Sequence, residues 1–92
     1  MCELRFKESS EGKKLVDATV KTGPDAKVDV SLELLEDGYV KFLRATESSG
    51  GASWDYDGSI EEDVERFGKA HKGLIGMLAK KIRKVVENGH DQ

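Results

Sequence analysis

The sequence predicts an α+β fold, in which an antiparallel sheet of four or five strands is followed by one long C-terminal helix packed on the apolar face of the sheet. Apolar and polar residues alternate with a period of two over most of the first sixty residues, whereas the period is 3.6 from Ser59 onward. The 92 residues suffice for one domain with one small core. We therefore expect a single domain spanning residues 1–92, with the sheet in residues 1–58 and the helix in residues 59–88.

The first three strands are marked by alternation and by the turns that separate them. Apolar side chains occupy every second position in residues 2–7, 16–21 and 28–34. Turn-forming residues fill the intervals 8–12 and 22–25. This alternation indicates a sheet with one apolar face and one solvated face.

The hairpin after the third strand determines which face of the fourth strand is buried. A two-residue turn would place Val40 and Phe42 on the solvated face, because a shift of one residue reverses every side chain. A three-residue loop at 36–38, with its glycine in the left-handed conformation, instead pairs Leu34 with Val40 and Leu32 with Phe42. The apolar match favours the longer loop.

Two features beyond this hairpin remain open at the level of sequence. The longer loop places Arg44 on the inner face of the sheet, close to its edge. Residues 52–56, which follow a turn at 48–51, form either a short fifth strand or an ordered loop.

The C-terminal helix is predicted from an apolar stripe and from signals at both of its ends. Ser59 as N-cap and Glu62 three residues later form a capping box, and Asn88–Gly89 is a suitable stop. The helix would contain about 28 residues. Three glycines disfavour it by up to about 1 kcal/mol each: Gly68, Gly73 and Gly76. Either the helix kinks near Gly73, or the glycines allow another segment to approach closely.

The two periodicities together predict the core. We expect it to contain Leu4, Phe6, Val16, Val20, Val28, Val30, Leu32, Leu34, Val40, Phe42, Val64, Phe67, Leu74, Leu78 and Ile82.

Composition excludes several classes of protein. No run of 18 apolar residues is present, so we expect no transmembrane helix and no membrane association, and no secretory signal pattern occurs. The single cysteine, Cys2, cannot form an internal disulfide, which is typical of a cytoplasmic protein. Charged residues make up 36% of the chain beside one Asn and one Gln, a thermophile-like balance that an idealised engineered sequence would share.

The densest chemical feature is the acidic segment 55–65. Its first six residues, Asp-Tyr-Asp-Gly-Ser-Ile, resemble the middle of an EF-hand calcium loop. With Gly58 at the turn position, however, the first ligand position falls on Ser53 and the closing glutamate position on Val64. The resemblance therefore implies a looser Ca²⁺ site, with the ligands Asp55, Asp57, Glu61 and Glu62. The alternative is that these acids complement the dipole of the first helical turn.

A second feature is the basic outer face of the helix. Residues 1–65 carry a net charge of −8 and residues 66–92 a net charge of +5. The cations that project away from the apolar stripe could meet phosphates or other anions: Lys69, Lys72, Lys80, Arg83 and Lys84. A four-stranded meander followed by one helix is similar to a PUR-type repeat, a nucleic-acid-binding unit, in the order of its elements only. The other interpretation is a solvated helix face.

The remaining candidates concern His71 and self-association. His71 lies within the apolar stripe, where we interpret it as a core histidine because a general base would need a second polar group nearby. Residues 74–79 are apolar nearly all round the helix, which predicts a homodimer through 73–79. Its interface residues are Gly73, Ile75, Gly76 and Met77. A break at Gly73 that folds the last segment over the sheet is the intramolecular alternative.

The sequence contains no paired nucleophile and base, no phosphate-binding loop and no catalytic pair of carboxylates. We therefore expect a small, non-catalytic binding or interaction domain rather than an enzyme. A calcium-type site in the acidic segment or an anion or nucleic-acid site on the basic face would be its ligand site. An unidentified protein partner is the remaining alternative.

Overall fold

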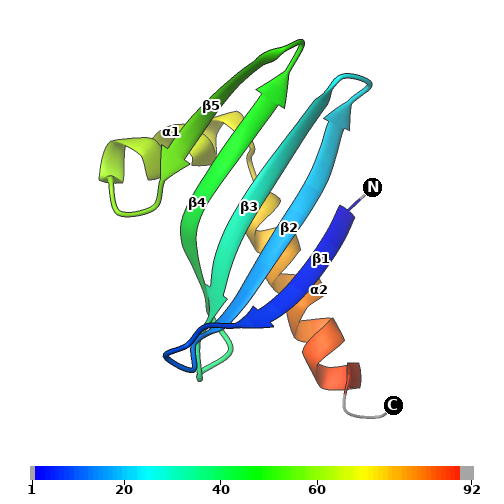
Figure 1. The fold of residues 1–92 in the computed structure, drawn as a ribbon, viewed down its shortest axis with the longest axis vertical. Coiled ribbons are helices and arrows are strands. Elements are labelled where there is room, and N and C mark those ends of the chain that lie inside the picture. Colours follow the sequence, from blue (N-terminus) through cyan, green and yellow to red (C-terminus); the bar gives the residue numbers. More distant parts are fainter. Residues whose placement is uncertain (1, 90–92) are drawn as a thin grey trace.

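The computed structural model describes residues 2–89 as a five-stranded antiparallel sheet followed by two helices (Figure 1). The strands lie in the sheet in chain order, so each is hydrogen-bonded to its neighbours in sequence. Their bounds are β1 Cys2–Glu8, β2 Lys14–Gly23, β3 Ala26–Leu34, β4 Val40–Ser49 and β5 Ala52–Asp57. The helices are α1 Glu61–Ala70 and α2 Leu74–Gly89. The fold class is thus α+β as predicted, and residues 52–57 form a fifth strand.

The longer β3–β4 loop predicted from the apolar pattern is confirmed. Leu34 pairs with Val40 and Leu32 with Phe42, and Gly38 has a φ of 90°. The amide of Gly38 donates a hydrogen bond to the carbonyl of Leu35 over 3.0 Å, which closes the turn. Val40 and Phe42 are partly buried against the core, so the register argument holds.

Strand β4 contains a bulge that the sequence pattern did not predict. Ser31 of β3 pairs with Arg44 and the next residue, Leu32, pairs with Phe42, which leaves Leu43 without a partner in β3. The extra residue reverses the alternation, because each side chain beyond it moves to the opposite face. Arg44 is consequently exposed, opposite Ser31, and the prediction that it lies on the inner face is wrong. Ala45, 1% exposed, takes the inner position instead.

The predicted single helix is wrong, because the chain leaves the helical path between Ala70 and Leu74. Gly73 adopts a φ of 76°, which a side chain would disfavour. The amide of His71 still donates to the carbonyl of Phe67, whereas the amide of Leu74 donates to the carbonyl of His71. The kink near Gly73 that the sequence allowed is therefore a complete break between two helices.

The predicted capping box is also absent. The N-cap residue of α1 is Ile60, and it makes no side-chain capping hydrogen bond. The hydroxyl and the amide of Ser59 both donate to the Asp57 carboxylate, over 2.7 and 2.8 Å. Because Asp57 engages Ser59 in this tight turn, the helix begins after Ile60 rather than at Ser59.

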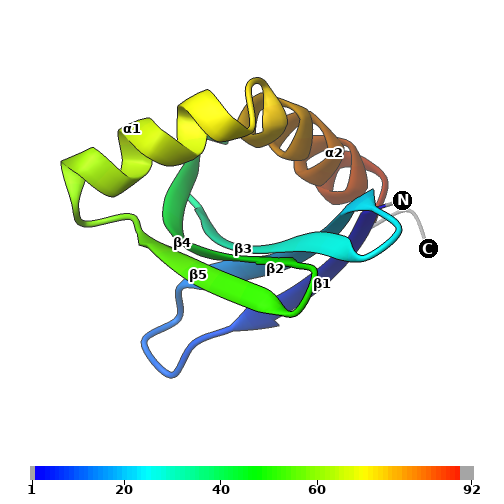
Figure 2. The same ribbon diagram turned by 90° about the horizontal axis from the view of Figure 1, so that it is seen from above.

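Both helices lie along one face of the curved sheet (Figure 2). The buried helix residues Phe67, Leu78 and Ile82 belong to the same apolar cluster as the sheet residues. The Phe67 ring stacks on Phe42 with 5.0 Å between centroids, and it packs against Tyr56 in a T-shaped arrangement with 5.1 Å between centroids. Four buried residues were missing from the predicted core: Ala18, Ala45, Tyr56 and Ala79. Phe6 and Val64 were predicted to be buried, but they are 45% and 38% exposed.

Candidate functional site

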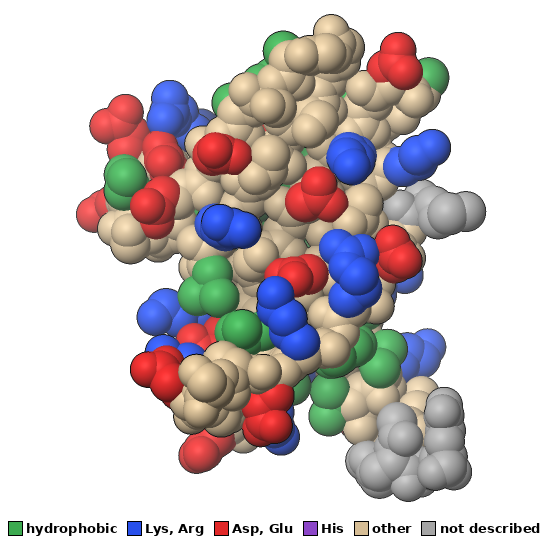
Figure 3. Space-filling model, in the orientation of Figure 1, with side chains coloured by type: hydrophobic (Ala, Val, Ile, Leu, Met, Phe, Trp, Pro, Cys, Tyr) green, Lys and Arg blue, Asp and Glu red, His purple; other side chains and the backbone are tan. Residues whose placement is uncertain are grey.

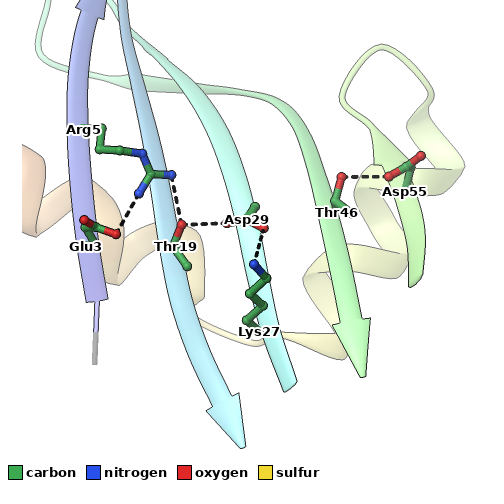
Figure 4. A network of polar contacts seen from close by, with 7 residues as sticks. All are labelled: Glu3, Arg5, Thr19, Lys27, Asp29, Thr46 and Asp55. Carbon is green, nitrogen blue, oxygen red and sulfur yellow. Dashed lines mark hydrogen bonds and ion pairs between the residues drawn. The ribbon is translucent and has the colours of Figure 1, made fainter. Parts of the chain in front are cut away.

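Two of the four acidic residues predicted to bind calcium have separate partners. Asp55 accepts a hydrogen bond from the Thr46 hydroxyl over 2.7 Å on the outer face of the sheet (Figure 4). Asp57 accepts a hydrogen bond from the Ser59 hydroxyl. Glu61 and Glu62 lie in the first turn of α1 and are exposed. Within residues 2–89, no group of three or more His, Cys, Asp or Glu side chains is placed to hold a metal ion.

The acid that stabilises this segment is Asp63, which the sequence interpretation did not single out. Its carboxylate accepts a hydrogen bond from the amide of Asp57 over 3.0 Å and pairs with Arg66 over 2.7 Å. These two interactions lower the pKa of Asp63, and the hydrogen bonds from Ser59 lower the pKa of Asp57. The contacts connect the end of β5 to the first turn of α1.

The break at Gly73 divides the cations of the predicted basic face between two helices. Lys69 lies on α1 and pairs with Glu65 over 3.5 Å, and Lys72 lies in the connection. The other three cations are exposed on α2: Lys80, Arg83 and Lys84. The predicted basic face is therefore not part of one helix, and the anion or nucleic-acid site on these cations stays a prediction.

The predicted dimer residues also have different environments. Ile75 is partly buried and packs against the core. Gly73, Gly76 and Met77 are exposed and line a shallow hollow on α2. After the break at Gly73, Ile75 packs within the same molecule, which agrees with the intramolecular alternative that the sequence left open. The homodimer through 73–79 stays a prediction.

His71 has the polar neighbour that the sequence did not reveal. Its Nε2 lies 2.9 Å from Oε1 of Glu47, and the two side chains are 13% and 17% exposed. The hydroxyl of Tyr56 donates to the same Glu47 oxygen over 3.1 Å and accepts a hydrogen bond from Nε1 of Trp54 over 2.9 Å. Burial, with Glu47 beside it, raises the pKa of Tyr56. The network joins the break between the helices to β4 and β5.

The position of Glu47 explains why this network was missed. Glu47 pairs with Trp54 and opposes Val28, so it lies on the core face of the sheet. That placement follows from the bulge at Leu43, which is not visible in the sequence. Tyr56 carried a usable signal, because it is an aromatic residue two positions from Trp54 in a strand and therefore shares its face.

A groove opens at the end of the sheet where the β1–β2 and β3–β4 turns lie beside each other, at the bottom of Figure 1. Its cavity volume is about 600 Å³, which is in the range of ligand pockets. We call it the turn-end groove, and it is lined by residues 11–14, residues 33–36, Gly38, Arg83, Val86 and Glu87.

The turn-end groove combines apolar walls with charges of both signs. Leu34, Leu35 and Val86 are its apolar residues, and Leu35 and Val86 are 37% and 43% exposed. Its cations are Lys13, Lys14 and Arg83, and its acids are Glu11, Glu33, Glu36 and Glu87. The Arg83 guanidinium reaches across from α2 to the carbonyl of Gly38, 3.5 Å away. No sequence pattern indicates this groove, since its residues come from three separate segments.

Comparisons with known protein families, with characterised proteins and with solved structures found no match to this chain. Neither α1 nor α2 is long and apolar enough to span a membrane. Fold and site define a small α+β domain.

Proposed function

We propose that this chain is a small, non-catalytic interaction domain that receives an apolar side chain of a protein partner in the turn-end groove. The observation that carries the proposal is the exposure of Leu35 and Val86 within a concave surface of about 600 Å³. Burying these side chains would contribute about 25 cal/mol for each Å² of apolar surface removed from water.

The charges around the groove support a peptide segment as the ligand rather than a small anion. Three cations and four acids line the groove together with the apolar residues, so neither sign of charge dominates. A polypeptide supplies amide groups and side chains of both signs around an apolar anchor, which matches such a rim.

Two further ligand classes stay predictions. Ca²⁺ would bind the acidic residues Asp55, Asp57, Glu61 and Glu62, and an anion or nucleic acid would bind the cations Lys69, Lys72, Lys80, Arg83 and Lys84. The charged side chains on the outer face of the sheet are mixed in sign (Figure 3), which gives nucleic acid no continuous basic surface there.

One NMR experiment compares the three ligand classes. The ¹⁵N-labelled protein is titrated separately with N-acetyl-leucinamide, calcium chloride and a mixed-sequence oligonucleotide. We expect N-acetyl-leucinamide to shift the amides of Leu35, Gly38 and Val86. Calcium binding would instead shift residues 55–62, and an oligonucleotide would shift residues 69–84 in a salt-dependent manner. Absence of any shift around the turn-end groove at millimolar N-acetyl-leucinamide would contradict the proposal.

A further inference from the structure

Strand β1 forms one edge of the sheet, and its free side has no strand beside it within residues 2–89. It pairs with β2 without interruption from Cys2 to Glu8, so its free edge contains no bulge and presents a row of backbone N–H and C=O groups. Such an edge is a template for another strand.

The core face of β1 is incompletely covered. Leu4 and Phe6 face the core, because they pair with Ala18 and Val16, which are 0% and 1% exposed. Phe6 is nevertheless 45% exposed, and Leu4 is partly buried. A partner at this edge would therefore remove apolar surface from water in addition to forming backbone hydrogen bonds.

The outer face of β1 carries charges that complement one another. Glu3 and Arg5 lie on this face at the edge, where the Arg5 guanidinium pairs with Glu3 over 3.0 Å and donates to Thr19 over 2.9 Å (Figure 4). Arginine has five N–H donors, so both contacts leave donors for a neighbouring molecule.

We propose that two copies of this chain dimerise by antiparallel pairing of their β1 strands, with Leu4 on the two-fold axis. In this register each Glu3 lies opposite Arg5 of the second copy, and each Cys2 lies opposite its Phe6. Both copies keep their helices on the same side of the joined sheet, because Leu4 faces the core in each of them. The contact is isologous and closes after two copies.

Charge selects this register over its neighbours. Shifting the pairing by one residue would set core-facing residues of one copy opposite outward-facing residues of the other, which puts the helices on opposite sides of the joined sheet. The registers that keep the helices on one side are those with a neighbouring residue, Glu3 or Arg5, on the axis. An axis at Glu3 sets two glutamates against each other, and an axis at Arg5 sets two arginines against each other. Opposite charges directly across two strands are favourable, whereas like charges are unfavourable. Only the register with Leu4 on the axis has two opposite-charge pairs and no like-charge pair among residues 2–6.

The other edge strand fits a second copy less well. β5 carries Asp55 and Asp57 on its outer face and no cation there. Pairing of two β5 strands would therefore form no opposite-charge pair. The interface proposed at β1 also shares no residue with the turn-end groove, so its test is independent of the proposed function.

The test exchanges the charges of Glu3 and Arg5 and measures dimerisation by sedimentation equilibrium. We expect the wild type to dimerise at high micromolar concentration. Glu3→Arg and Arg5→Glu should each raise the dimer dissociation constant at least about tenfold, because each creates two like-charge pairs across the axis. An equal mixture of the two variants should associate again, since every pair across the axis then has opposite charges. The double variant E3R/R5E should dimerise by itself for the same reason.

Glu8→Arg is the matched control, because it makes the same charge change in the same strand outside the paired residues 2–6. We expect this variant to dimerise like the wild type. Thermal unfolding followed by circular dichroism verifies that each variant is folded. A monomeric wild type, single variants that dimerise as well as the wild type, or a mixture that stays monomeric would each overturn the proposal.

Discussion

Replacing Gly58 by alanine should destabilise the protein by about 3 kcal/mol, because no space exists for a methyl group at this position. A Cβ atom built on Gly58 would lie 2.5 Å from the carbonyl oxygen and 2.8 Å from the carbonyl carbon of Leu43. It would also overlap the carbonyl oxygen of Phe42. All three atoms belong to the backbone of β4 at its bulge, so the clash cannot be relieved by rotating a side chain.

The magnitude follows from two contributions. The amide of Gly58 donates a hydrogen bond of 2.7 Å to the carbonyl of Leu43, and losing it costs about 1 kcal/mol. Displacing the packed backbone costs a further 1–3 kcal/mol or so. Their sum is a large part of a typical free energy of unfolding of about 5–15 kcal/mol.

The assay is equilibrium unfolding in urea, followed by far-ultraviolet circular dichroism. Gly68→Ala is the matched control, because Gly68 lies inside α1 and a Cβ there meets no heavy atom within 4 Å. We expect this control to stabilise the protein by about 0.5–1 kcal/mol through its higher helix propensity. A Gly58→Ala variant within about 0.5 kcal/mol of the wild type would refute the steric argument.

Three further results are expected. Gly73→Ala should cost about 1 kcal/mol in the same urea assay, because the φ of 76° at the helix break is strained for alanine, and an unchanged stability would contradict this role of the glycine. Phe67→Ala should cost about 4 kcal/mol, whereas Val64→Ala, at a 38% exposed position of the same helix, should cost clearly less; equal losses would contradict the observed core. The pKa values of Asp57 and Asp63 are lowered below 3.8 in the folded state, so their contribution to stability is present above about pH 4 and is lost as the pH falls below it. Thermal unfolding between pH 2 and 6 measures this loss, and Asp63→Asn should make the pH dependence less steep.

The sheet was largely predictable because each strand has one apolar and one solvated face. Alternation set the pairing of Leu34 with Val40, and a slip by one residue would have exposed both side chains. The bulge at Leu43 was not predictable in this way. It depends on the close approach of Gly58, 15 residues later in the chain, and on the backbone hydrogen bond between these residues.

The helical part shows a different limit of the sequence argument. Periodicity continues through Gly73 because α1 and α2 both turn apolar side chains toward the same sheet, so the pattern alone does not reveal the break. The predicted capping box does not form, because the Ser59 hydroxyl donates its hydrogen bond to the Asp57 carboxylate before the helix begins. Local signals therefore predicted that the region is helical but did not fix its boundaries.

The candidate sites were less predictable than the fold, since they combine distant segments. His71 and Glu47 are 24 residues apart, and their contact requires both the bulge in β4 and the break after α1. The turn-end groove likewise forms only when two sheet turns and the last turns of α2 meet. The acidic run visible in the sequence instead divides among separate contacts, such as that of Asp55 with Thr46. The basic residues are divided between the two helices.

The most direct test of the turn-end groove compares two valines of α2. Val85 and Val86 are 44% and 43% exposed, but only Val86 lines the groove. Substitution by serine therefore makes the same chemical change on the same helix, inside and outside the site. With the affinity for N-acetyl-leucinamide measured by NMR titration, we expect Val86→Ser to raise the dissociation constant about fivefold, equivalent to about 1 kcal/mol, and Val85→Ser to leave it nearly unchanged. Equal effects of the two substitutions, or a larger effect of Val85→Ser, would contradict the assignment of the groove as the binding site.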